Sequence, residues 1–257
     1  MALPDLFEFL DEFVVLRNRW GFTQGKLSDD AFEATLKEKA EPVLARWKAR
    51  LLSEDIFLPK ARYGYFPASA RGDELLVYAA DTNPTTPPDQ RRLLARLPFP
   101  RQPKGRRLCI ADFFMPESSG ALDVLALQVV TLGQRAADFA STLYQADAYG
   151  DYFYFHGLAT ELTEAYAERL HAQVRHELGI HHRDAENLRQ LFSQGYQGSR
   201  YSYGYPACPD LEGNGPILDL LEGQRIGIHM TDSFQMDPEY TTSALIAWHP
   251  QARYFSV

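Results

Sequence analysis

The sequence predicts an α+β protein, in which one domain holds a largely antiparallel sheet flanked by helices. Short β-type runs occur both before and after a long amphipathic stretch at 152–178, so strands flank a helix on both sides along the chain. Turns at Asp237-Pro238 and His249-Pro250 separate the last of these runs. No repeat, low-complexity segment or linker divides the chain, and we therefore expect a single domain.

Composition narrows the class of protein. The chain has 257 residues and is 45% hydrophobic, which suffices for a buried core. It contains no run of eighteen apolar residues and no signal-like N-terminus, so we expect no membrane association and a cytoplasmic location. A net charge of −8 makes nucleic acid an unexpected partner. Cys109 and Cys208 form no Cys-x-x-Cys pattern, and we interpret both as buried packing residues rather than a disulfide or metal site.

The N-terminal region predicts two helices. The first runs from Asp5, a candidate cap, to Gly21, with Asp11 as a solvated residue on its polar side. Ser28 should cap the second helix, which extends to Leu51 and is kinked or split by Pro42. The apolar stripes that predict these helices are Leu6, Phe9, Leu10 and Phe13 in the first, and Phe32, Leu36, Ala40, Val43 and Trp47 in the second.

The pattern then changes to β-type runs. We expect strands at 62–67 and 74–79, joined by a turn over 69–73, and a third strand at 107–114. A connector lies between the last two strands and contains six prolines and seven basic residues around a short helical piece at 90–97. Its basic residues, between 91 and 107, are typical of a solvated face, and a docking patch for an acidic partner is the alternative.

The second half of the chain predicts a strand at 123–131, a helix from Gly133 to about Gln145, and a long helix over 152–178 that ends at Gly179. The buried stripe of the long helix is Leu158, Leu162, Tyr166, Leu170 and Val174, with Glu164 and Glu168 away from it. A short helix at 217–221 and strands at 225–234, 241–248 and 253–257 should complete the fold.

Histidines at the end of the long helix do not predict a metal site. His176-Glu177 is followed by His181, whereas a zinc-protease motif requires His-Glu-x-x-His on one helix face. The spacing is wrong by one residue and Gly179 ends the helix. We therefore interpret His176, His181 and His182 as a solvated helix end and expect no metal.

The stretch most informative about function is Gly195–Asp210, GYQGSRYSYGYPACPD. Three glycines and two prolines exclude a regular helix. Arg200 offers a planar fork suited to a carboxylate, the glycines allow close backbone approach, and tyrosine rings can stack on a heterocycle or face a sulfonium. The alternative, that the tyrosines are core packing and Arg200 is an ordinary surface charge, is equally compatible with the residues alone. The four tyrosines are Tyr196, Tyr201, Tyr203 and Tyr205.

Two motifs in this stretch, GYQGSR and GYPACP, resemble the signature loop of the C-terminal activation domain of cobalamin-dependent methionine synthase, which binds S-adenosylmethionine. The resemblance extends from about Leu10 to Val257. It implies that residues 1–257 form one C-shaped activation domain around a bent antiparallel sheet flanked by helices. Further matching pieces begin at Gly64 (GYFPA), Cys109 (CIADF), Thr163 (TEAYAERLH), Thr231 (TDSF) and Tyr254 (YFSV).

The resemblance also implies which residues bind the ligand. Arg200 would hold the methionine carboxylate, and Asp11 and Glu164 would lie near the ammonium group. The remaining implied contacts are Ser202, Gly204 and Tyr205 with the adenosyl part, and Tyr254 and Phe255 as a terminal pair beside the ligand. No catalytic acid or base is implied. This sequence has Tyr201 and Tyr203 where prolines occur in one branch of the family.

The function implied by the resemblance is reactivation. In such enzymes the activation domain docks on the cobalamin-binding module, reduced flavodoxin or a similar donor supplies an electron, and S-adenosylmethionine methylates the cobalt, which converts inactive cob(II)alamin to methylcobalamin. The cofactors would be S-adenosylmethionine and cobalamin, the latter held by a partner domain or chain. Because this chain lacks Asp-x-His-x-x-Gly, we expect a fragment or a separate activation subunit that does not turn over alone.

Two alternatives remain. One is a stand-alone S-adenosylmethionine-dependent methyltransferase acting on an organic acceptor, and the other is a docking module without a ligand.

Overall fold

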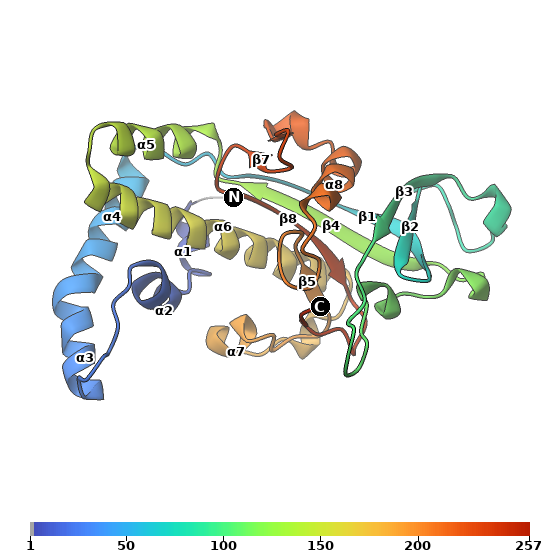
Figure 1. The fold of residues 1–257 in the computed structure, drawn as a ribbon, viewed down its shortest axis with the longest axis horizontal. Coiled ribbons are helices and arrows are strands. Elements are labelled where there is room, and N and C mark those ends of the chain that lie inside the picture. Colours follow the sequence, from blue (N-terminus) through green and yellow to red (C-terminus); the bar gives the residue numbers. More distant parts are fainter. Residues whose placement is uncertain (1–2) are drawn as a thin grey trace. The chain divides into compact units, whose positions relative to one another are not determined.

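The computed structural model describes residues 3–257 and separates into two compact units. Unit 1 comprises the chain up to residue 60 together with 131–168 and 238–241, and unit 2 comprises 61–130, 169–237 and 242–257. The longest helix, α6 (Tyr149–Glu177), contributes residues to both (Figure 1). Within the part of the chain that the structure describes, no helix combines the length and apolar character needed to cross a bilayer.

Unit 1 is helical, and its N-terminal region corrects the first predicted helix. The chain forms α1 (Leu3–Phe7), leaves the helix, and restarts at α2 (Glu12–Val14), which continues as a π-helical turn at Val15–Arg19. Asp11 causes the restart because its Oδ1 accepts from the backbone N–H of Val14 at 3.1 Å, as an N-cap does. The predicted stripe fails at Phe13, which is 49% exposed.

The second predicted helix is confirmed with a local change of winding. Ser28 accepts from the Ala31 N–H at 3.3 Å and caps α3 (Asp29–Thr35). A π-helical turn at Leu36–Ala40 then leads into α4 (Glu41–Ser53), where Pro42 occupies the first turn. This is the position at which proline removes no hydrogen bond from the helix, so the predicted disruption is confined to the turn before it.

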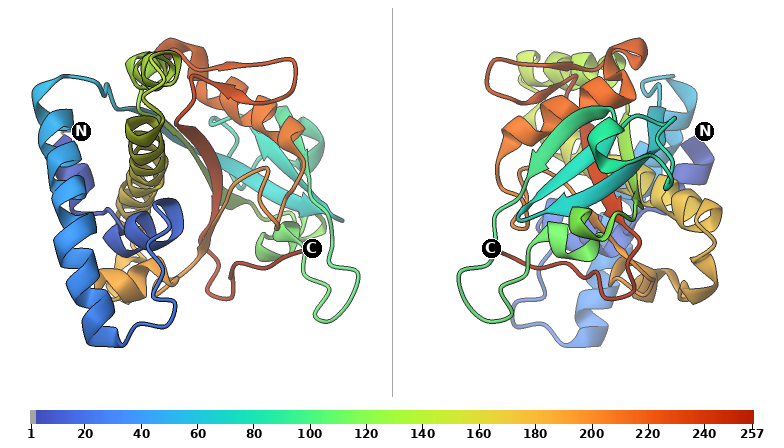
Figure 2. Two further views of the ribbon diagram at one scale, coloured as in Figure 1. Left: turned by 60° about the vertical axis from the view of Figure 1, so that its left-hand side comes forward. Right: turned by 90° about the vertical axis from the view of Figure 1, so that its right-hand side faces the viewer.

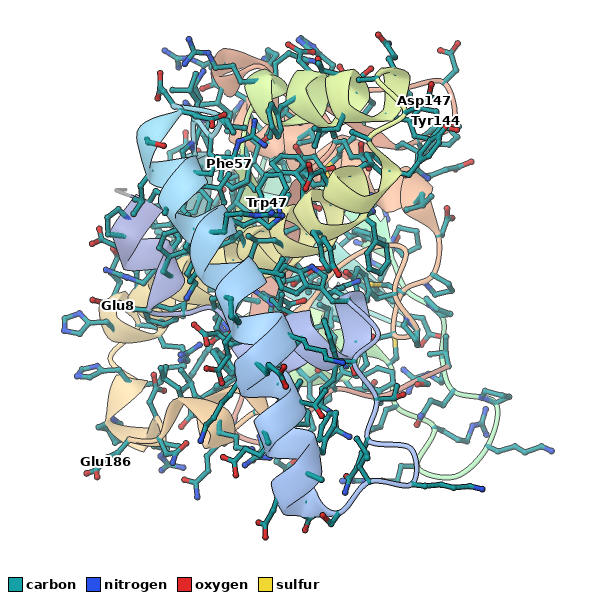
Figure 3. All side chains as sticks on the ribbon, turned by 90° about the vertical axis from the view of Figure 1, so that its left-hand side faces the viewer. Glu8, Trp47, Phe57, Tyr144, Asp147 and Glu186 are labelled. Carbon is teal, nitrogen blue, oxygen red and sulfur yellow. The ribbon has the colours of Figure 1, made fainter. Side chains whose placement is uncertain are left out.

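An aromatic cluster forms the core of unit 1. The Phe155 ring of α6 lies 4.8 Å from Phe139 of α5 (Gln134–Gln145), 5.7 Å from Trp47 of α4 and 5.8 Å from Phe57, measured between centroids. Figure 3 labels Trp47, which belongs to α4, and Phe57. Such edge-on and tilted contacts are those that aromatic rings prefer. The three helices are therefore held together chiefly by ring packing.

A six-stranded sheet organises unit 2, in the order β3-β2-β1-β4-β8-β5 (Figure 1). The β1–β2, β2–β3 and β5–β8 pairs are antiparallel, as predicted for the sheet. Figure 2 shows β8, in dark red, running beside β4. The strands are β1 (Lys60–Arg71), β2 (Glu74–Tyr78), β3 (Leu93–Pro98), β4 (Asp123–Thr131), β5 (Ser199–Tyr201) and β8 (Thr241–Ala247), and β6 (His229–Met230) pairs with β7 (Met236–Asp237) in a separate ribbon.

Two predictions, one within the connector and one at its end, are wrong in a related way. The expected strand at 107–114 is instead a 3₁₀ turn at Ile110–Phe113, because the Asp112 carboxylate accepts from the Cys109 N–H at 2.9 Å and is itself bound by Arg101 at 2.7 Å. The third strand forms where a helical piece was expected, at β3, and Leu97 pairs there with Leu75 of β2. Tertiary pairing thus overrides the local pattern at both places.

Predictions for the second half are mostly confirmed. Strands β4 and β8, helix α5, helix α8 (Asn214–Leu221) and α6 lie where expected, and all five residues of the predicted α6 stripe are buried. Glu168, expected to lie away from the buried stripe, is also buried, and this corrects that part of the prediction. Of the strand expected at 225–234, only the short β6 forms; its first two residues end a 3₁₀ turn at Gly223–Ile226, and residues 253–257 join no strand.

Unit 2 has one large core cluster on the sheet, to which Leu125, Leu127 and Leu245 contribute. In a second, smaller cluster, Val174 of α6 packs with Ala126 of β4 and Ile246 of β8. The short helix α7 (Leu188–Phe192) precedes the tyrosine-rich stretch in the chain. These clusters fix the backbone on which the candidate site is built.

Candidate functional site

The tyrosine-rich stretch, residues 195–210, begins as an edge strand of the sheet. Arg200 is the central residue of β5 and pairs with Ile246 of β8. Gly198, with φ of +88°, precedes the strand, and a Cβ there would lie 2.6 Å from the Ala247 carbonyl oxygen. Glycine is therefore required for β5 to join the sheet. Arg200 is thus fixed at its backbone and half-buried along its side chain.

A tight turn follows Arg200. Gly204, at φ +86°, donates its N–H to the Cys208 carbonyl oxygen at 2.9 Å, and Cys208 N–H donates to Tyr205 O at the same distance. A Cβ on Gly204 would lie 2.7 Å from Leu211. The thiol of Cys208 donates to Ser202 O at 3.1 Å, and burial raises the pKa of this thiol to about 12. The turn is consequently closed by its own backbone and by an unreactive cysteine.

The tyrosines of this stretch divide into two kinds. Tyr201 and Tyr203 are core residues: Tyr201 stacks on Phe113 with centroids 6.3 Å apart, and Tyr203 stacks on Phe99 at 5.9 Å. Burial raises the pKa of both hydroxyls. Tyr205, in contrast, is 46% exposed at the turn. The packing interpretation therefore holds for Tyr201 and Tyr203, and ring stacking on a ligand stays a prediction for Tyr205.

The C-terminal tail, residues 253–257, is held against this stretch by hydrogen bonds rather than by a strand ladder. The Tyr201 hydroxyl donates to Arg253 O at 2.8 Å, and Tyr254 N–H donates to Oε1 of Gln194 at 3.1 Å. Val257 N–H donates to Pro206 O at 3.0 Å. A side chain of the connector completes the set, since Gln102 Nε2 donates to Ser256 O at 2.7 Å. The tail thus has a defined path although it has no regular structure.

Its two aromatic residues face different surroundings. Tyr254 is 40% exposed, with its ring 6.4 Å from that of Tyr201 and nearly parallel to it. Phe255 is 9% exposed and lies 6.3 Å from the Phe113 ring in the core. The ring of Tyr254 is therefore accessible, whereas the ring of Phe255 packs in the core and holds the tail there. A direct contact of either ring with a ligand stays a prediction.

In unit 1, Asp11 and Glu164 come together around a third carboxylate, that of Glu161. Burial raises the pKa of Glu161, the Arg19 guanidinium lowers it, and the charges of Glu164 and Asp11 raise it again, with a raised pKa as the result. Arg19 Nε binds Glu161 at 3.1 Å. Glu161 is not among the residues that the sequence predicts for a site; it lies on α6 three residues before Glu164 and adjoins the apolar stripe. Its only sequence signal is that helical proximity.

The two groups differ in the chemistry that they can perform. The unit 2 group combines a guanidinium, a glycine turn and two accessible tyrosine rings, which suits an anionic group attached to a flat ring. The unit 1 group places three carboxylates beside one arginine, which suits a cation. Among residues 3–257, no cluster of three or more metal-binding side chains could hold a metal ion, and the His176 and His181 rings simply pack at 4.4 Å between centroids.

Comparisons with known proteins show the family of this chain and its fold. Residues 15–257 match the family described as vitamin B12 dependent methionine synthase, activation domain. The methionine synthases of Mycobacterium tuberculosis (strain ATCC 25618 / H37Rv) and Mycobacterium leprae (strain TN) are 37% and 36% identical over the whole chain, which spans 22% of each of these relatives. A crystal structure of the MetH reactivation domain bound to AdoHcy superimposes with a TM-score of 0.85, at 24% identity, over 100% of this chain and 79% of that one. The last comparison establishes the fold.

Proposed function

The chain belongs to the activation-domain family of vitamin B12-dependent methionine synthase, and from this membership we propose that it binds S-adenosylmethionine. We further propose that it supports the reductive methylation of inactive cob(II)alamin to methylcobalamin within methionine synthase. A solved structure of the same fold is described as bound to AdoHcy, the demethylated form of this ligand, which supports the proposal.

The observation that carries the proposal is the construction of residues 198–208. Arg200 is fixed on β5, and the next residues form a turn that only glycine permits at position 204. Exposed rings of Tyr205 and Tyr254 accompany it. A guanidinium beside a glycine turn and aromatic faces is suited to an amino acid carboxylate attached to a nucleoside.

The proposed roles follow from the chemistry of each group. Arg200 binds the carboxylate of the ligand by a two-pronged contact. Backbone groups of Ser202 and Gly204, with the Tyr205 ring, contact the adenosyl part, and Tyr254 lies over it with Phe255 packed beneath. Asp11 and Glu164 attract the ammonium group, and Glu161 strengthens the negative potential that they share. When bound, S-adenosylmethionine supplies the methyl group, and the protein supplies position and electrostatics.

The proposal includes partners and location. The cobalamin-binding module of methionine synthase would present the corrinoid, and reduced flavodoxin or a similar donor would supply the electron. The cobalamin lies with that module in this proposal, so this chain needs no corrinoid ligand of its own. A cytoplasmic location accords with these partners.

Calorimetry with S-adenosylmethionine tests the proposal. We expect saturable binding by the wild-type chain and a loss of at least about tenfold in affinity for Arg200→Ala, because one charge-assisted, bidentate contact is removed. Arg106→Ala, which removes an exposed arginine of the connector, is the matched control and should bind like the wild type. Absence of binding by a folded wild-type chain would contradict the proposal. Methyl transfer to an organic acceptor without a corrinoid protein would instead favour a stand-alone methyltransferase.

A further inference from the structure

A cavity lies in unit 2 beside the start of the tyrosine-rich stretch. Its volume is about 370 Å³, within the range of small-molecule sites. The side chains that matter for its chemistry are Arg183, Gln194, Gln197 and Arg253, and no described residue that lines it is acidic. It shares no lining residue with the group proposed above for S-adenosylmethionine.

The two arginines of this cavity carry positive charge that no carboxylate offsets. Arg253 donates from Nη1 to the backbone oxygens of Ala252 at 2.7 Å and Pro250 at 3.3 Å, and no ion pair joins it or Arg183 to an acidic side chain among residues 3–257. Arg96 and Arg101 of unit 2 differ, since each has a carboxylate at 2.7 Å. In a chain with a net charge of −8, two uncompensated cations in one cavity are a local exception.

The acidic residue next to Arg183 in the chain does not neutralise it. Asp184 binds the guanidinium of Arg175, with Nε 2.9 and 3.0 Å from its two carboxylate oxygens. Arg175 is fully buried, and its guanidinium lies 4.2 Å from the centroid of the Tyr196 ring, which lines the cavity. The carboxylate of Asp184 therefore offsets the charge of the buried Arg175 and not that of Arg183. The electrostatic potential inside the cavity remains positive.

The walls of the cavity are fixed by the protein itself. Gln194 has a left-handed backbone, at φ +61°, and its side chain accepts from Tyr254 N–H at 3.1 Å and donates to Ser199 Oγ at 3.2 Å. Gln197 donates to Trp248 O at 3.0 Å. A Cβ on Gly195 would lie 2.6 Å from Gln190 O, so this wall also requires glycine. A wall in which both glutamine side chains are held by hydrogen bonds has a defined shape before a ligand arrives, which lowers the cost of binding.

We propose that this cavity binds the oxyanion group of a small molecule, a phosphate or a carboxylate, between Arg183 and Arg253. Guanidinium groups form paired hydrogen bonds with both oxyanions. The volume exceeds what inorganic phosphate fills, so the ligand carries the oxyanion on a larger body, such as a nucleoside diphosphate or a small polycarboxylate. Because Arg253 directly precedes Tyr254, an occupied cavity also holds the tail that bears this accessible ring.

Titrations of the full ¹⁵N-labelled chain at low ionic strength test the proposal, with ADP, inorganic phosphate and citrate as separate probes. We expect saturable shifts of the Gln194 and Gln197 side-chain amides and of the Arg183 and Arg253 Nε signals. Tighter binding of ADP would identify a phosphorylated ligand, and tighter binding of citrate a polycarboxylate. The double variant Arg183→Gln/Arg253→Gln should lower the affinity for the better probe by at least about tenfold.

Lys104→Gln/Arg106→Gln is the matched control, because it removes the same two charges from exposed positions of the connector. Retention of affinity within about twofold in the control supports a defined site. An equal loss in both variants, or no saturable response to any probe at millimolar concentration, would overturn the proposal. Thermal unfolding establishes that both variants fold. Parallel titration with S-adenosylmethionine keeps this test separate, since failure of the proposed function would appear there in the wild-type chain.

Discussion

The two groups of candidate residues are stabilised in different ways. In unit 2, Arg200 and the turn at 202–208 are held by a sheet ladder, backbone hydrogen bonds and stacked rings. In unit 1, Asp11, Glu161 and Glu164 come from α6 and the start of α2, and their like charges oppose one another around Arg19. The first group is set by packing and the second by electrostatics.

This difference indicates how each group would respond to a ligand. A packed turn already has its bound shape, so binding orders few further residues and costs little conformational entropy. A cluster of carboxylates gains from the arrival of a cation, because the new charge offsets their mutual repulsion. We therefore expect shape to dominate at the unit 2 group and charge preference at the unit 1 group, and three substitutions test the contrast.

The largest expected effect comes from adding one methyl group beside the packed tyrosines of unit 2. Gly213 has an ordinary backbone, with φ −61°, but a Cβ there would lie 2.1 Å from the buried Tyr203 ring. Gly213→Ala should therefore lower the free energy of unfolding by about 3 kcal/mol, the upper part of the range for an overpacked core. Urea denaturation followed by circular dichroism measures it.

Gly215→Ala is the control for this substitution. It lies two residues further along, inside α8, where an added Cβ would meet nothing within 4 Å. Alanine favours a helix over glycine, so this variant should gain about 0.5–1 kcal/mol. Similar stability changes in the two variants would show that the Tyr203 ring is not tightly packed, and the contrast would then fail.

A smaller effect should follow from loss of one hydroxyl. Tyr201→Phe keeps the ring stacked on Phe113 and removes the hydrogen bond to Arg253 O, at an expected cost of about 1 kcal/mol. Hydrogen exchange of the Tyr254 and Val257 amides should quicken. Tyr203→Phe is the control, because the buried Tyr203 hydroxyl has no hydrogen-bond partner among the described residues and its removal should cost nothing. Unchanged exchange in Tyr201→Phe would mean that other contacts hold the tail.

The same contrast explains which parts of the fold the sequence predicts. Periodic elements with a long stripe, such as α6, follow from the pattern because burial of that stripe is their main source of stability. The segments at 93–98 and 107–114 do not, because β3 exists through pairing with β2, and the 3₁₀ turn through the link between Arg101 and Asp112. Neither partner is visible within a local window.

For the candidate residues the limit is similar. Composition alone locates the stretch at 195–210, since its glycines and prolines exclude a helix, and it leaves open which tyrosines are core. The positions of Tyr201 and Tyr203 depend on Phe113 and Phe99, residues remote in sequence. Asp11 reads as a solvated residue until its capping of α2 is seen, and Glu161 becomes apparent only when it lies beside Asp11 and Glu164.

The smallest expected effect concerns Glu161 and tests the electrostatic interactions of the unit 1 group. The pKa of Glu161 is raised in the folded state, so the folded chain binds this proton more tightly than the unfolded chain does. Its contribution to stability is therefore fully present below the unfolded pKa, near 4.5, and is lost as pH rises through the folded pKa. Glu161→Gln keeps an oxygen that can accept from Arg19 and removes the titration.

Comparison of urea midpoints between about pH 4 and pH 7 measures this contribution. The stability of the wild type relative to Glu161→Gln should fall as pH rises through this window, by less than about 1 kcal/mol because Arg19 partly offsets the charge. Glu8→Gln, at an exposed position labelled in Figure 3, should leave the pH dependence unchanged. Parallel curves for the wild type and Glu161→Gln would show that burial and the charges of Glu164 and Asp11 do not raise the pKa of Glu161 in the folded chain. The preference of unit 1 for a cation would then lose its physical basis, whereas the packed turn of unit 2 would be unaffected.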